Sequence, residues 1–128
     1  MAKGIVTTLF VTTFATIILL GATANAADKA FRKCASCHSI EEGAGNKVGP
    51  NLWNIMNRGT AQSEGFKYSK KFAAWAEENP MWTPELMDAW LTNSKKLVKG
   101  TKMNFKERKE AKRADIIQYL QSMGEAAE

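Results

Sequence analysis

Cys34-Ala35-Ser36-Cys37-His38 is the stretch that decides the fold expected for this chain of 128 residues. It contains both cysteines and the single histidine of the whole sequence. Two thiols separated by two residues and followed directly by histidine are the pattern of a c-type haem attachment site in an exported protein. The thiols would add to the haem vinyl groups as thioethers, and His38 would be placed to ligate the iron.

Three other interpretations of the motif fit less well. A structural zinc site takes four Cys or His ligands, and the chain has three such residues in all. A thioredoxin-like redox pair belongs to a βαβ context, which the downstream sequence does not offer. A disulfide between Cys34 and Cys37 would close a very short loop and contribute little folding stability. A redox or disulfide-bonded cysteine pair remains the alternative to haem attachment.

The first 26 residues have the composition of an export signal. Lys3 precedes an uncharged, mostly apolar run from Ile5 to Leu20, and Ala24-Asn25-Ala26 has the small-x-small pattern of a signal peptidase site. The run is shorter than the roughly 18 to 20 residues of a spanning helix. We therefore predict a cleavable signal peptide over residues 1–26 and one domain over residues 27–128. Retention of the first segment as a membrane anchor is the alternative.

Size and charge limit what the mature domain can be. At 102 residues, which is 128 less 26, a domain buries about two thirds of its unfolded surface and is marginally stable. A covalently attached haem would add the apolar surface that a small scaffold needs. The formal net charge of the whole chain is +5. A positive surplus suits an acidic protein or an anionic membrane, and export makes nucleic acid the least expected partner.

The local signals alternate between helix and loop, without the strict apolar alternation of strands, and predict an all-α domain. We expect helices over residues 28–34, 52–57, 70–76, 84–93 and 106–123, with Asp28, Ser69 and Thr83 as N-caps. The stretch 94–105 is predicted to be a loop with a glycine at its centre. Gly49-Pro50 is most simply a turn. Alternatively, the Pro50 carbonyl accepts a hydrogen bond from the ring of His38 and orients it.

An iron bound by His38 takes either a second protein ligand or an open position. No second histidine exists, so the candidates are a lysine or one of the thioethers of Met56, Met81, Met87, Met103 and Met123. Met87 and Met123 lie on predicted helix faces, where methionine usually fills the core. Met103 lies in the loop 94–105, where backbone freedom would let it reach the metal. Position alone leaves this choice open.

From Asp28 to Met123 the sequence resembles class I cytochromes c, close to the branch of mitochondrial cytochrome c and bacterial cytochrome c2. The matching motifs follow the family's order along nearly all of the predicted domain. They are Phe31, Cys34–His38, Gly49-Pro50-Asn51-Leu52, Arg58-Gly59, Gly65-Phe66-Lys67-Tyr68, Trp82, Gly100-Thr101-Lys102-Met103, Phe105 and Arg113-Ala114-Asp115-Ile116-Ile117-Gln118-Tyr119-Leu120. The resemblance implies about four to five short helices around one covalently attached haem c, with the first and last helices crossing through Phe31, Ile116 and Tyr119.

The resemblance also implies how the iron is bound. Cys34 and Cys37 would form the thioethers, and His38 and Met103 would be the two axial ligands. The carbonyl of Pro50 would accept a hydrogen bond from His38. Both axial positions would then be filled by protein, which implies an electron carrier and no enzyme.

Five further residues are assigned to the haem pocket by the same resemblance. Arg58, Tyr68 and Trp82 match positions that bind a haem propionate in the family. Thr101 and Phe105 match positions in the wall beside the axial methionine.

The chain departs from the family pattern at three positions. Lys99 stands where the family often has proline, which we expect to loosen the methionine loop. Trp90 stands where a tyrosine usually hydrogen-bonds the methionine sulfur, and we expect the change to retune the iron's potential. Ala27 stands near the position of a glycine that lets the first and last helices approach, so we expect a looser crossing.

The implied function is that of a periplasmic, monomeric, single-haem carrier. It would shuttle single electrons by outer-sphere transfer from a bc1-type quinol-oxidising complex to a terminal oxidase or a photosynthetic reaction centre. Lysines beside the haem-binding segments would steer the haem edge toward acidic docking surfaces on these respiratory or photosynthetic complexes. These lysines are Lys33, Lys95, Lys96, Lys99 and Lys102. A haem peroxidase with Met103 displaced is the alternative from another class, left open by Lys99 and Trp90.

Overall fold

The computed structural model describes residues 22–125, and the predicted signal run from Ile5 to Leu20 lies outside them. The described chain forms five helices in the order α1 (Ala22–Ala35), α2 (Lys70–Glu78), α3 (Pro84–Thr92), α4 (Ser94–Leu97) and α5 (Glu110–Glu125). Over this range the single β pairing is an isolated bridge between Gly59 and Met81. The prediction of an all-α fold with four to five short helices is therefore confirmed.

Helix α1 begins earlier than the sequence predicted. It starts at Ala22, so Asp28 lies inside the helix and is not its N-cap. The residues before Asp28 are mostly alanine, the best helix former, and contain no glycine or proline after Gly21 that would stop the helix. The proposed cleavage point after Ala26 falls within α1 and stays a prediction.

The helix predicted over residues 52–57 is wrong, because this segment is a series of turns. The side-chain oxygen of Asn51 accepts a hydrogen bond from the Trp53 amide at 2.8 Å, which offers the backbone a local alternative to a helix. Asn54 then adopts a left-handed conformation with φ of 53°, which a right-handed helix cannot contain.

The starts of α2 and α3 agree with the sequence signals. The Ser69 side chain accepts a hydrogen bond from the Phe72 amide, and the Thr83 side chain accepts one from the Leu86 amide. Pro84 occupies the first turn of α3, where its missing N–H costs nothing. These two N-caps were predictable because each bond spans three residues.

Helix α4 was not predicted, and α5 begins later than expected. The four residues of α4 are too few to show a helical period, and Asn93 caps it by accepting from the Lys96 amide at 3.1 Å. Residues 106–109 are excluded from α5 because Glu107 bonds elsewhere. Its amide donates to the Leu91 carbonyl at 2.9 Å, and its carboxylate accepts from the Lys109 amide at 3.1 Å.

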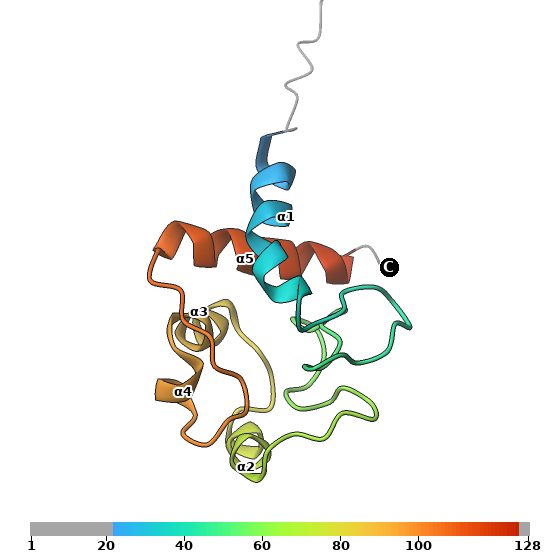
Figure 1. Ribbon diagram of the computed structural model, residues 1–128, viewed down its shortest axis with the longest axis vertical. Helices are drawn as coiled ribbons and strands as arrows, with labels where there is room; N and C mark the ends of the chain where they lie inside the picture. The colour runs from blue at the N-terminus through green and yellow to red at the C-terminus, as the bar shows by residue number, and fades with distance from the viewer. Residues whose placement is uncertain (1–21, 126–128) are drawn as a thin grey trace, which may run out of the picture.

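The first and last helices cross, as the sequence predicted (Figure 1). At the crossing the Phe31 and Tyr119 rings lie with centroids 4.7 Å apart, and Ala27 is buried. A bidentate ion pair between Asp88 and Arg113 joins α3 to α5, with a shortest distance of 2.7 Å. No helix within residues 22–125 is both long enough and apolar enough to cross a membrane.

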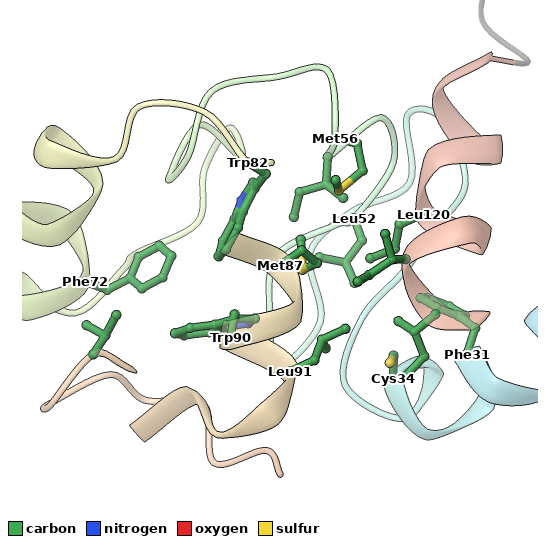
Figure 2. Packing of buried hydrophobic residues seen from close by; sticks show 14 residues of the cluster. Phe31, Cys34, Leu52, Met56, Phe72, Trp82, Met87, Trp90, Leu91 and Leu120 are labelled. Carbon is green, nitrogen blue, oxygen red and sulfur yellow. The ribbon is translucent and has the colours of Figure 1, made fainter. Parts of the chain in front are cut away.

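The hydrophobic core has two ends (Figure 2). At one end Phe31 and Leu120 lie near Cys34. At the other end the rings of Trp82 and Trp90 face Phe72, with centroids 5.3 to 6.5 Å apart among the three. Between them the core does not close completely, and this incomplete closure creates the candidate site.

Candidate haem-binding site

A mostly apolar cavity of about 290 Å³ lies inside the helical fold. Its lining comes from α1, α2, α3, α5 and the loops between them. All ten residues that the sequence assigned to the site line this one cavity. They are Cys34, Cys37, His38, Pro50, Arg58, Tyr68, Trp82, Thr101, Met103 and Phe105. The structure thus brings together side chains from the beginning, middle and end of the domain.

The end of α1 and the turn that follows it bring the two thiols and the imidazole to the cavity. The amides of Cys37 and His38 both donate to the Cys34 carbonyl, at 3.0 and 2.9 Å, and close a tight turn. Cys34 is buried and Cys37 is exposed, and both thiols are free. Burial raises the pKa of the Cys34 thiol to about 11. As a free thiol Cys34 is therefore protonated at neutral pH.

His38 is oriented by the loop that follows it. Its Nδ1 lies 2.7 Å from the Pro50 carbonyl oxygen. Because a carbonyl can only accept, this contact requires the proton on Nδ1 and leaves Nε2 as the nitrogen able to bind a metal. Burial lowers the pKa of His38, against the opposing effect of the Pro50 hydrogen bond, and favours the neutral ring that a metal requires.

Gly49 is the residue of this loop that sequence reasoning passed over. A β-carbon at this position would lie 2.3 Å from Cε1 of His38 and 2.6 Å from Nδ1. The ring therefore packs directly against the Gly49 backbone, where no side chain fits. The sequence predicts for this Gly-Pro pair a turn or a Pro50 carbonyl that accepts from His38, but no role for Gly49 itself.

Thr101, Met103 and Phe105 reach the cavity from the segment after α4. Thr101 is buried, and the other two are half-buried. Gly100 allows this path, because its φ of +91° is a conformation that side-chain-bearing residues rarely adopt. The segment therefore presents a thioether to the same cavity as the His38 ring.

Arg58, Tyr68 and Trp82 form a more polar part of the lining. The Arg58 guanidinium is half-buried and donates to the Asn51 carbonyl, and burial lowers its pKa. The Tyr68 hydroxyl accepts from the Ser63 amide at 3.2 Å. Trp82 is 6% exposed. The structure places all three at the cavity, and their role toward a propionate stays a prediction.

Much of the remaining lining is apolar, and of these residues only Trp90 is expected from the sequence to lie beside the methionine. Met87, Trp90 and Leu91 form the α3 stripe at helical spacing, and Ile116 and Leu120 come from α5. A helical stripe signals burial but does not show what it is buried against.

These residues fit a haem. The cavity is apolar, as a porphyrin requires, and it exposes two thiols for thioethers together with an imidazole whose Nε2 is available. A thioether lines the same cavity. Within residues 22–125 no group of three or more His, Cys, Asp or Glu side chains is arranged to bind a metal ion.

Comparison with known proteins agrees with this geometry. A family model described as Cytochrome c matches residues 24–124. Cytochrome c of Trypanosoma brucei brucei is 45% identical over 83 residues, which cover 64% of this chain and 86% of that protein. Cytochrome c-550 of Novispirillum itersonii is 34% identical over 100 residues, which cover 72% of this chain and 90% of that protein.

The fold matches as well. The solved structure of cytochrome c2 from Rhodospirillum centenum superposes with a TM-score of 0.71 and 33% sequence identity, over 80% of this chain and 98% of that one. These matches confirm the class I cytochrome c fold and the resemblance to proteins that carry haem c. The relatives are electron carriers rather than enzymes. This chain therefore belongs to the cytochrome c family and is a haem-containing electron carrier.

Proposed function

We propose that this chain is an exported single-haem carrier in which Cys34 and Cys37 form the thioethers and His38 and Met103 ligate the iron. One observation carries the proposal: these four side chains line one apolar cavity, with the His38 ring oriented by the Pro50 carbonyl at 2.7 Å. That contact leaves Nε2 as the metal-binding atom and fixes the direction of the ring.

When bound, haem c supplies one-electron chemistry at iron. The residues of this chain determine how that chemistry is used. His38 and Met103 would hold the iron, and a thioether paired with an imidazole would favour the reduced state and raise the potential. With two protein side chains bound, no substrate would reach the metal, and the haem would supply outer-sphere electron transfer. The apolar lining, including Trp90 and Leu91, would shield the bound haem from water.

The polar part of the lining is proposed to bind a haem propionate. Arg58 is half-buried and carries its charge beside the cavity, where a carboxylate would compensate for the loss of solvation. Tyr68 and Trp82 add an O–H and an N–H from the neighbouring loop segments. The wall next to Met103 would be completed by Thr101 and Phe105.

We further propose that a lysine-rich surface docks on acidic surfaces of a bc1-type donor and of an oxidase or reaction-centre acceptor, with the carrier acting as a monomer. The five predicted lysines are all exposed. Lys33 is less available than Lys95, Lys96 and Lys99 because it forms an ion pair with Glu107 at 2.8 Å. Stopped-flow oxidation by a partner complex tests this proposal. A rate that is the same at low and high ionic strength would contradict electrostatic steering.

The periplasm is the proposed location. Residues 1–26 have the features of a signal peptide, and the relatives include bacterial cytochromes c-550. N-terminal sequencing of the purified protein separates the two forms. A mature protein beginning at Ala27 supports cleavage, and one that keeps Met1–Ala26 supports the membrane-anchored alternative.

An absorption spectrum tests the ligand set. The purified protein should show a low-spin haem and the weak near-infrared band of methionine ligation, and Met103→Ala should abolish that band. Met81→Ala is the matched control, because Met81 is 46% exposed and lies outside the cavity lining. A high-spin ferric spectrum at neutral pH would refute the carrier proposal and would favour the peroxidase alternative.

A further inference from the structure

We propose that Ser94 is a positioning residue for Met103: its buried hydroxyl binds the carbonyl of Met103 and the amide of Phe105, just after the methionine, and so keeps the thioether in the cavity. This inference rests on the proposed ligation of the iron by Met103. Ser94 itself is absent from the cavity lining and acts only through the segment that it binds.

The hydrogen bonds of Ser94 converge on the methionine segment. Its Oγ lies 3.1 Å from the Met103 carbonyl oxygen and 3.0 Å from the Phe105 amide nitrogen. A hydroxyl has one proton and two lone pairs, so it can donate to the Met103 carbonyl and accept from the Phe105 amide at once. The Ser94 amide adds a third bond, to the Phe105 carbonyl at 3.1 Å.

These bonds are shielded from water. Ser94 is 0% exposed, so a group that loses its partner here cannot turn to solvent instead. Ser94 is also the first residue of α4 and follows Asn93, which connects it directly to the end of α3. The hydroxyl therefore links the methionine segment to the start of α4 and, through Asn93, to the end of α3.

The segment from residue 99 to residue 105 forms few hydrogen bonds besides those to Ser94. Among the described residues, the remaining hydrogen bonds from residues 99–105 run from the Thr101 amide to the Val98 carbonyl at 3.2 Å and from Lys102 Nζ to the Lys67 carbonyl at 2.9 Å. Lys99 and Gly100 lie just before Thr101 and Lys102 in the chain, and neither has the rigid ring of a proline. Ser94 thus supplies most of the hydrogen bonds that restrain the position of the Met103 backbone.

Imidazole binding to the ferric protein measures this restraint directly. Imidazole can bind the iron only while Met103 is dissociated, so its apparent Kd falls as the dissociated fraction rises. Ser94→Ala leaves the Met103 carbonyl and the Phe105 amide without their buried partner. We expect the affinity for imidazole to rise by a factor of about 10 to 100.

Ser63→Ala is the matched control. Ser63 is also a buried serine, and its hydroxyl donates to Asn46 Oδ1 at 2.9 Å, away from the methionine segment. The Ser63→Ala protein should lose a comparable amount of stability in urea. Its affinity for imidazole should change by less than about threefold, because the lost hydrogen bond does not hold the methionine segment. Equal imidazole affinities in the Ser94→Ala and Ser63→Ala proteins would overturn the inference.

Amide hydrogen exchange in the unaltered protein supplies a second test, which holds even if Ser94→Ala does not fold. Saturation with imidazole should accelerate exchange of the Phe105 amide and leave the Ala73 amide of α2 unchanged. Unchanged exchange at Phe105 overturns the role of Ser94. If the unaltered protein lacks the near-infrared band, the ligation by Met103 itself is refuted, and the inference is refuted with it.

Discussion

Replacement of Gly49 by alanine tests whether the loop backbone positions the imidazole. The added β-carbon would lie 2.3 Å from Cε1 of His38, whereas ordinary contact begins at 3.4 Å. The loop cannot easily retreat, because the Gly49 amide donates to the Cys37 carbonyl at 2.8 Å and its carbonyl accepts from the Lys47 amide at 3.0 Å. The ring must therefore move by about 1 Å, given those two distances.

The cost follows from two contributions. Overpacking at a site that cannot relax costs about 1 to 3 kcal/mol. Movement of the ring also weakens the hydrogen bond between His38 Nδ1 and the Pro50 carbonyl, which contributes about 0.5 to 1.5 kcal/mol. We expect Gly49→Ala to lower the free energy of unfolding by about 1.5 to 4.5 kcal/mol in all.

Guanidinium denaturation followed by helical circular dichroism measures this loss. Gly45→Ala is the matched control, because a β-carbon at Gly45 meets nothing within 4 Å and this glycine has no positive φ. The control variant also reports the small gain that any Gly→Ala change makes by restricting the unfolded chain. If Gly49→Ala is as stable as Gly45→Ala, the proposed contact between backbone and imidazole is refuted.

Three further predictions concern other contacts. The Lys33 ammonium and the Lys109 amide lower the pKa of Glu107 from 4.5 to about 2. The stability difference between the unaltered protein and Glu107→Gln should therefore be complete above pH 4.5 and disappear as the pH falls toward 2. A difference in urea melts that stays constant across this range would contradict the ion pair. Phe31→Ala should cost about 3 to 5 kcal/mol in the same melts, since the ring is 4% exposed at the crossing of α1 and α5; a loss below about 1 kcal/mol would show that this crossing does not depend on the ring. Lys99→Pro should stabilise the protein by about 0.4 to 1 kcal/mol, because the preceding residue is already extended, with φ of −125° and ψ of 94°; a lower melting temperature would show that the segment needs the freedom of lysine.

The ion pair of Lys33 changes the expectation for docking. From sequence this lysine belonged with the four in and after α4, since all five lie near haem-binding motifs. In the structure Lys33 lies 2.8 Å from a Glu107 carboxylate that is only 8% exposed. Part of its charge is therefore compensated within the molecule, and we expect Lys95, Lys96 and Lys99 to contribute more to steering.

Local signals in the sequence predicted the parts of the fold that depend on neighbouring residues. The caps at Ser69 and Thr83 each bond an amide three residues away, and the haem motif lies within five consecutive residues. Both kinds of feature can be predicted without knowing what the rest of the chain does. The ten site residues followed from the order of family motifs, and the structure places all ten at one cavity.

Only the tertiary structure decided the features that depend on distant partners. Glu107 delays the start of α5 because it pairs with a lysine 74 positions earlier and with the Leu91 carbonyl. Ser94 binds the methionine segment 9 and 11 positions away, and no pattern around Asn93-Ser94 indicates this. Such hydrogen bonds are stable because packing shields them from water. Residue types and spacing alone do not specify which groups become buried, because burial arises only when the whole chain has folded.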